Sequence, residues 1–189
     1  HPKTGVNTLQ EFVALARAKP GTLNYGSSGI GSSHHLTMEA MKAALGIDVT
    51  HVPFKGSSQS VPALIGGQVD VAFSALPSLS GFVKGGKVKL LATNGAKRSI
   101  HEPDVPAIAE MVPGFDFAVV VGMLAAAGTP QAAIDRMAAE MEKVAKMPDT
   151  IQVLSNAGVD AVGAGPAEYG KTILDENERL AKAIKAAGI

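Results

Sequence analysis

Glycine, serine and histidine residues gather in one short stretch of the chain, residues 24–36, with the sequence NYGSSGIGSSHHL. These residue types could build four kinds of site: a phosphate loop, a metal site, a catalytic nucleophile or a cradle for an anion. Each kind needs further residues at defined spacings. The surrounding sequence therefore decides which site the stretch can form.

A dinucleotide fingerprint is incomplete here. Gly29 and Gly31 match its first two glycines, but His34 occupies the place of the third, where a side chain would block close packing. Residues 50–56 contain no acidic residue that could bind a ribose. A phosphate loop also fails at residues 81–88, GFVKGGKV, because Val88 replaces the required Ser or Thr and the expected helix precedes the loop.

Metal and nucleophile sites lack partners. His35 and Glu39 have helical spacing and could supply two metal ligands, but no third ligand is evident, so an ion pair or a helix-start histidine fits better. Residues 26–29, GSSG, lack the G-x-S-x-G elbow, and no catalytic triad can be named. We therefore predict no catalytic residue, no metal and no cofactor.

An anion cradle needs the least. Residues 27–33 offer backbone N–H groups, four hydroxyls and the conformational freedom of Gly29 and Gly31, placed where a helix N-terminus carries partial positive charge. Uncharged donors suit a carboxylate that must be released again. The alternative is an ordinary helix start capped by serine.

Composition excludes several classes of protein. Seventeen basic and seventeen acidic residues cancel without forming a block of one sign, so a nucleic-acid partner is poorly supported. Disulfides and thiolate chemistry are excluded because the chain has no cysteine. No apolar run approaches the roughly 18 residues of a membrane span. The start at His1, without methionine or leader, predicts a processed or truncated product.

Strand and helix patterns alternate along the chain. The spacing of apolar residues and the Gly and Pro stops predict helices over residues 8–19, 33–45, 58–65, 77–84, 130–146 and 166–187, with a short helix near Ile108. Apolar runs predict strands over residues 23–25, 49–52, 69–73, 88–93 and 117–124. This order predicts an α/β fold with a mostly parallel sheet flanked by helices, which binds ligands at the carboxyl ends of its strands.

Seven ordered blocks carry a resemblance to a known family: PGTLNYGSSG (20–29) with GSS (31–33), HVPFKG (51–56), GGQVD (66–70), KRS (97–99), PDVP (103–106), AGTP (127–130) with DR (135–136), and IKAAGI (184–189). Together they resemble the periplasmic solute-binding receptors of tripartite tricarboxylate transporters, often called the Bug family. The resemblance runs nearly end to end.

The resemblance implies a type II periplasmic-binding fold, a clamshell of two lobes. Residues 1–20 would be a linking helix, residues 21–116 the second, ligand-binding lobe, and residues 117–189 a segment returning to the first lobe. The chain would then hold one complete lobe and the C-terminal part of the other. We expect an N-terminally truncated chain whose returning segment packs on its own second lobe or on a neighbouring molecule, and the exposed incomplete lobe would allow dimerisation.

The resemblance also implies the ligand-binding residues. They follow three strands whose loops should share one sheet edge: Ser27, Ser28, Gly29, Gly31, Ser32, Ser33 and His34 after the first strand, Lys55 and Gly56 after the second, and Ser74 and Ala75 after the third. Asp70 is expected to make structural hydrogen bonds instead, because its carboxylate would repel an acidic ligand.

The implied function is that of a non-enzymatic receptor in the periplasm. It would capture a small carboxylate, such as a dicarboxylate, tricarboxylate, amino acid or aromatic acid, and pass it to the membrane subunits of a transporter. Two alternatives stay open: an α/β enzyme that binds a nucleotide or phosphate at the Gly/Ser loop, and the ligand-sensing domain of a regulator. The sequence does not choose among the carboxylates, since the missing lobe would share in that choice.

Overall fold

The computed structural model describes residues 1–188. The chain divides into two compact units. Unit 1 contains His1–Ala118 together with the end of the chain from Ala181, and unit 2 contains Val119–Leu180. Each unit is described by itself, and the assignment of the chain's segments to lobes stays a prediction.

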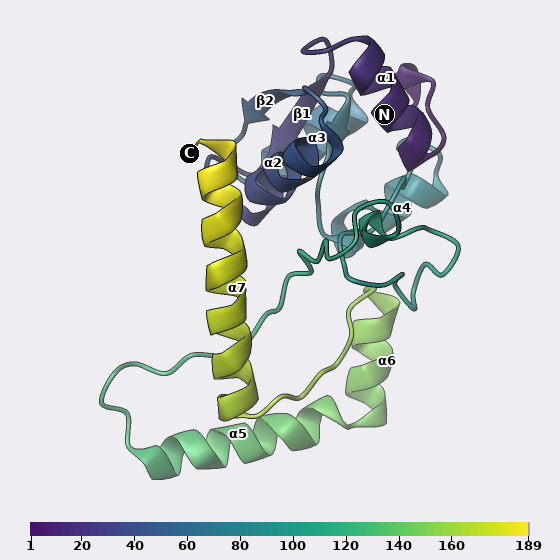
Figure 1. Ribbon diagram of the computed structural model, residues 1–189. Helices are drawn as coiled ribbons and strands as arrows, with labels where there is room; N and C mark the ends of the chain where they lie inside the picture. Colours follow the sequence, from purple (N-terminus) through teal and green to yellow (C-terminus); the bar gives the residue numbers. More distant parts are fainter. Residues whose placement is uncertain (189) are drawn as a thin grey trace. The chain divides into compact units, whose positions relative to one another are not determined.

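Unit 1 is built on a three-stranded parallel sheet with the order β2-β1-β3 (Figure 1). A helix precedes the first strand and another follows each strand, which confirms the predicted α/β alternation. The elements are η1 (Pro2–Thr4), α1 (Leu9–Ala18), β1 (Asn24–Ser27), α2 (Ser33–Leu45), β2 (Thr50–Pro53), α3 (Ser57–Ile65), β3 (Val71–Ala72), α4 (Leu76–Lys84) and η2 (Ile108–Glu110).

The two faces of this sheet carry separate apolar clusters because successive strand residues point to opposite sides. Tyr25 and Val71 face the first cluster, which contains apolar side chains of α1 and α2. Val52 and Ala72 face the second, with side chains of α3 and α4. The sheet is therefore covered by helices on both sides, as parallel sheets require.

Local sequence signals set the ends of α2. Ser32 is its N-cap, and its hydroxyl accepts a hydrogen bond from the His35 N–H at 3.3 Å. Gly46 ends the helix in the left-handed region, with φ of 60°. These signals confirm the predicted bounds of this helix, and α1, α3, α4 and α5 also lie within one residue of their predicted bounds.

Two predicted strands are wrong. Residues 88–93 contain only a single bridge, between Thr93 and Ala107. Residues 117–124 form no strand, although Phe117 exchanges hydrogen bonds with Asn94. A strand exists only where a neighbouring strand accepts and donates along its length, and an apolar sequence pattern does not supply that neighbour.

Unit 2 is helical. It contains α5 (Gln131–Ala145), α6 (Pro148–Asn156) and most of α7 (Pro166–Ala187), of which α6 was not predicted. Pro148 begins α6, and its fixed φ suits the first turn of a helix. Gly122 lies against the ring of Tyr169, so close that a side chain on Gly122 would clash with the ring.

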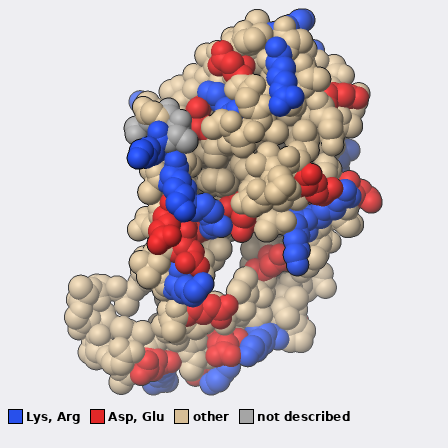
Figure 2. Space-filling model, viewed as in Figure 1, with Lys and Arg blue, Asp and Glu red and all other residues tan. Residues whose placement is uncertain are grey.

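Charged side chains of both signs are interspersed on the face shown in Figure 2. In unit 2, oppositely charged residues pair one helical turn apart: Lys143 with Glu140, Lys146 with Glu142 and Lys171 with Asp175. Among the helices of residues 1–188, none has both the length and the hydropathy that a membrane crossing requires.

Candidate functional site

Three strand-to-helix loops meet at the carboxyl edge of the sheet. They are residues 28–32 after β1, which we call the glycine–serine loop, residues 54–56 after β2, and residues 73–75 after β3. Because all three strands are parallel, their carboxyl ends lie at one edge, which confirms that the loops share it. The Phe54 N–H donates to the Ser27 carbonyl and the Gly56 N–H to the Ser28 carbonyl, each at 3.1 Å.

Each of these loops runs into the N-terminus of a helix. Gly56 is the N-cap of α3 and Ala75 is the N-cap of α4, and within the described part of the chain neither helix has a side-chain hydrogen bond at its cap. The first N–H groups of a helix have no partner inside the helix, and they carry partial positive charge. The edge therefore gathers main-chain donors that favour an anion.

Three of the predicted serine hydroxyls are used inside the protein. Ser27 is fully buried, and its Oγ accepts from the Gly29 N–H at 3.1 Å and lies 2.6 Å from Nε2 of His51. Ser28 Oγ lies 2.8 Å from Nδ1 of His34, and Ser32 caps α2. These hydroxyls shape the glycine–serine loop. The loop is therefore a serine-capped helix start, and it is also a candidate anion cradle.

Other predicted hydroxyls differ in their surroundings. Ser33, the first residue of α2, is exposed. Ser74 follows β3, and its hydroxyl is one of two in residues 1–188 that are buried without a hydrogen-bond partner, the other being that of Thr93. Buried polar atoms are normally paired, so this unpaired hydroxyl marks Ser74 as a candidate residue of the site.

Two glycines allow the course of the glycine–serine loop. Gly29 has φ of 132° and Gly31 has φ of 76°, conformations that other residues rarely adopt. A Cβ on Gly29 would also lie 3.4 Å from the carbonyl oxygen of Phe54, in the neighbouring loop. The spacing of glycines in the sequence thus reflects backbone geometry.

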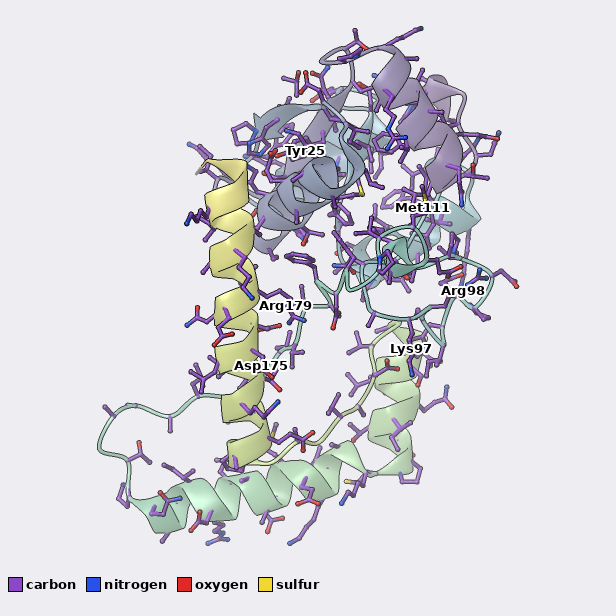
Figure 3. The ribbon with its side chains drawn as sticks, viewed as in Figure 1. Tyr25, Lys97, Arg98, Met111, Asp175 and Arg179 are labelled. Atoms are coloured by element: carbon purple, nitrogen blue, oxygen red, sulfur yellow. The ribbon has the colours of Figure 1, made fainter. Side chains whose placement is uncertain are left out.

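An aromatic stack lies beneath this loop. Tyr25 and His51 are cross-strand neighbours on β1 and β2, with ring centroids 4.7 Å apart, and His35 of α2 stacks on His51 at 4.0 Å. Figure 3 labels Tyr25, which lies among the strands and α2. The Tyr25 hydroxyl donates to Glu39 at 2.5 Å, and Glu39 also pairs with Lys42 at 2.7 Å.

Sequence reasoning did not find this stack. One available signal was the helical spacing of His35 and Glu39, which was considered only for a metal site. The other was the alternation of side chains along a strand, which places Tyr25 and His51 on the inner face of their strands. Both side chains of the considered metal pair have other partners, since His35 accepts from the Gly31 N–H and Glu39 accepts from Tyr25. Within the described residues, no three His, Cys, Asp or Glu side chains are grouped as metal ligands.

Burial governs the protonation of these groups. It lowers the pKa of His34, His35 and His51, and the charge of His35 lowers that of His51 further. Burial would raise the pKa of the Glu39 carboxyl, but hydrogen bonds from Lys42 and Tyr25 hold it below its ordinary value. At neutral pH the three rings are therefore neutral and the Glu39 carboxyl is ionised.

Two charged residues considered in the sequence analysis, Lys55 and Asp70, lie at opposite ends of the strands. The Lys55 side chain is exposed in the loop after β2, where its charge is near the helix N-terminus of α3. Asp70 precedes β3 and accepts from the Asn24 N–H at 2.8 Å at the start of β1. Asp70 thus lies at the opposite ends of the strands from the three loops, which confirms its structural role.

Comparison with known proteins gives the family. The sequence profile described as "Tripartite tricarboxylate transporter family receptor" matches residues 1–189. The chain belongs to this family. Membership in a family of receptors agrees with the expectation that the chain is not an enzyme.

Several curated relatives of this receptor chain are longer than the chain itself. The "UPF0065 protein in tcbD-tcbE intergenic region" of Pseudomonas sp. strain P51 is 32% identical over 178 residues, which are 93% of this chain and 53% of that protein. Protein BugT of Bordetella pertussis is 26% identical over 189 residues, which are all of this chain and 58% of BugT. The chain thus spans little more than half the length of these relatives.

Solved structures of similar proteins confirm the fold. The chain matches R. palustris Rpa4515, solved with adipate, with a TM-score of 0.90 and 30% identity over 97% of this chain and 62% of that one. It matches MatC of Rhodopseudomonas palustris, solved with bound malate, with a TM-score of 0.74 and 25% identity over 95% and 62% of the two chains. A third match, the periplasmic binding protein BugD, has a TM-score of 0.80 at 24% identity and supports the fold alone.

Proposed function

We propose that this receptor chain binds a small carboxylate at the carboxyl edge of its sheet, through the glycine–serine loop and the loops after β2 and β3. The observation that carries the proposal is the gathering of helix N-termini at one edge, two of them without side-chain caps in the described residues. The residues proposed to line the site are Ser28, Gly29, Gly31, Ser33, His34, Lys55, Gly56, Ser74 and Ala75, with Ser27 and Ser32 shaping it.

Two kinds of evidence support a carboxylate as the ligand. The donors at the edge are uncharged main-chain groups together with one exposed lysine, Lys55, a set that holds a carboxylate without trapping it. Two solved relatives were obtained with dicarboxylates, adipate and malate. We further propose that the protein acts in the periplasm and passes its ligand to the membrane subunits of a tripartite transporter, as the description of its family suggests.

Isothermal titration calorimetry tests the proposal. Adipate, malate, citrate, glutamate and benzoate are titrated into the purified chain, and into a version extended to the length of the relatives. We expect heat of binding for at least one acid, and weaker or no binding of inorganic phosphate. No heat with any acid in either version would overturn the proposal.

A matched pair of variants locates the site. Ser33→Asp adds a negative charge to the first turn of α2, and Gln10→Asp adds the same charge to the first turn of α1, outside the three loops. Repulsion predicts that Ser33→Asp weakens carboxylate binding about tenfold or more, although the charge favours the helix itself. Gln10→Asp should bind as the parent does. Equal affinities of the two variants would place the ligand elsewhere.

A further inference from the structure

Three histidine rings are hydrogen-bonded to the end of β1 and to the glycine–serine loop, two of them through serine hydroxyls and one through a main-chain N–H. His51 is hydrogen-bonded to Ser27 at 2.6 Å, and His34 to Ser28 at 2.8 Å. His35 accepts a hydrogen bond from the Gly31 N–H at its Nδ1, at 3.0 Å. The rings come from β2 and from the first turn of α2, so two rigid elements fix the glycine–serine loop between them.

The bond to Gly31 requires one protonation state of His35. A backbone N–H can only donate, so Nδ1 must offer its lone pair, and the proton of the neutral ring must lie on Nε2. A proton added to Nδ1 would set two donors against each other across 3.0 Å. His35 is 5% exposed as a residue, so its ring cannot easily turn toward water to avoid this conflict.

The surroundings of His35 also disfavour a second proton on its ring. Its ring is stacked on His51 of β2 at 4.0 Å, and Tyr25 of β1 lies beyond at 6.4 Å. On α2 itself, the Glu39 carboxylate favours a charged ring and the Lys42 ammonium disfavours it. Burial is the largest influence and lowers the pKa of His35, in agreement with the bond at Nδ1.

We propose that His35 is a positioning residue that holds Gly31 and the glycine–serine loop in the ligand-binding shape, and that protonation of His35 releases the loop and weakens ligand binding. The inference rests on the proposed function, because it assigns a control to the same site. It predicts that affinity falls as the pH is lowered through the range in which this ring takes up a proton.

A charge-based role predicts the opposite sign. If the histidines acted as cations toward an anionic ligand, acidification would strengthen binding by Coulomb attraction. In the positioning role, the loss of one hydrogen bond to the loop weakens binding, by about fivefold to tenfold at the usual strength of such a bond. The direction of the pH effect therefore distinguishes the two roles.

Two variants isolate the lone pair at Nδ1. His35→Asn keeps an acceptor oxygen near the position of Nδ1 and does not titrate, whereas His35→Phe keeps a stacking ring without an acceptor. Adipate affinity is measured by calorimetry from pH 5 to 8 for the parent and both variants. Protonation of adipate itself affects all three proteins equally, so the difference between parent and His35→Asn reports on the ring.

We expect the parent to lose about fivefold to tenfold more affinity than His35→Asn on acidification, and His35→Phe to bind weakly at every pH. Rescue by the asparagine would separate positioning from a general effect on stability. An affinity that rises on acidification in the parent relative to His35→Asn, or a variant His35→Asn that follows the parent throughout, would overturn the inference.

A second measurement needs no ligand. In the nitrogen-15 NMR spectrum of the ligand-free protein, the Gly31 amide signal should shift with pH at the same midpoint as the His35 ring, and should not do so in His35→Asn. If no acid binds but this shift is seen, the proposed function fails and the positioning role stands. A Gly31 signal that ignores the titration of His35 would overturn the positioning role whether or not a carboxylate binds.

Discussion

The two units use apolar side chains in opposite ways. Unit 1 contains every buried apolar residue of the described chain, from Val6 to Phe115 together with Ala183. In unit 2 neither α5 nor α6 has a buried residue. Many large apolar side chains of unit 2 are exposed instead: Val119, Val120, Val121, Met123, Leu124, Met137, Met141, Val144, Met147, Ile151, Val153, Val159, Val162 and Leu174.

This difference separates helix formation from packing. The helices of unit 2 have apolar residues at helical spacing, as α1 and α2 have, yet only the helices of unit 1 bury that face against a sheet. An amphipathic sequence predicts that a helix will bury its apolar face against another element. The same sequence does not determine whether such an element is present. The stability of this chain should therefore reside in unit 1.

Matched methionine variants give the largest expected effect. Met38 in α2 is fully buried, and Met137 in α5 is 52% exposed. Met38→Ala removes packed atoms from the core and should lower the free energy of unfolding by about 2–5 kcal/mol, whereas Met137→Ala should change it by less than about 0.5 kcal/mol. Urea denaturation followed by circular dichroism measures both. Similar losses in the two variants would contradict the comparison.

The second largest difference in stability is expected between a carboxylate of unit 1 and one of unit 2. Asp70 is nearly buried and bonds both the Asn24 N–H and Lys3, so Asp70→Ala leaves a backbone donor unpaired and should cost about 1–3 kcal/mol. Glu142 pairs with Lys146 on the exposed side of α5, and Glu142→Ala should not shift the urea midpoint measurably. A midpoint unchanged in Asp70→Ala would show that the bond to Asn24 is dispensable.

Glycines should respond with opposite signs. Gly29→Ala forces a side chain into an unfavourable backbone conformation in unit 1 and should cost about 1–3 kcal/mol. Gly170 lies inside α7 with open space around its Cα, so Gly170→Ala should stabilise the helix by about 0.5–1 kcal/mol. Thermal unfolding monitored by circular dichroism checks both, and a stabilising Gly29→Ala would refute the assigned role of that glycine.

Acidification from pH 8 to 5 should destabilise unit 1 through its buried histidines. Burial lowers the pKa of His35 and His51 in the folded chain below the 6.5 of a free ring, so the unfolded chain takes up these protons first. The free energy of unfolding therefore decreases as the pH falls below about 6.5, and it recovers when the pH is raised above that value. The double variant His35→Asn, His51→Gln should lose most of this pH dependence in urea titrations between pH 5 and 8, and His34, whose pKa burial also lowers, accounts for the remainder. If the pH dependence of stability persists unchanged in the double variant, it arises from other titratable groups.

Much of the candidate site was predictable because its signals are local. Ser32 and Gly46 mark the ends of α2 in the sequence, and the order of strands and helices predicts that three loops meet at one sheet edge. The partners of the hydroxyls were not predictable. Ser27 is bonded to His51, which lies 24 residues away, and only the pairing of β1 with β2 brings the two side chains together.

The sequence by itself determined the helices other than α6, the parallel α/β alternation and the position of the glycine–serine loop, because caps, glycines and apolar spacing act within a few residues. The tertiary structure alone decided that residues 88–93 and 117–124 form no strands, because strands need neighbours from distant parts of the chain. It also decided that Tyr25, His51 and His35 stack beneath the loop, since burial and register place a side chain only once the sheet and its covering helix are assembled.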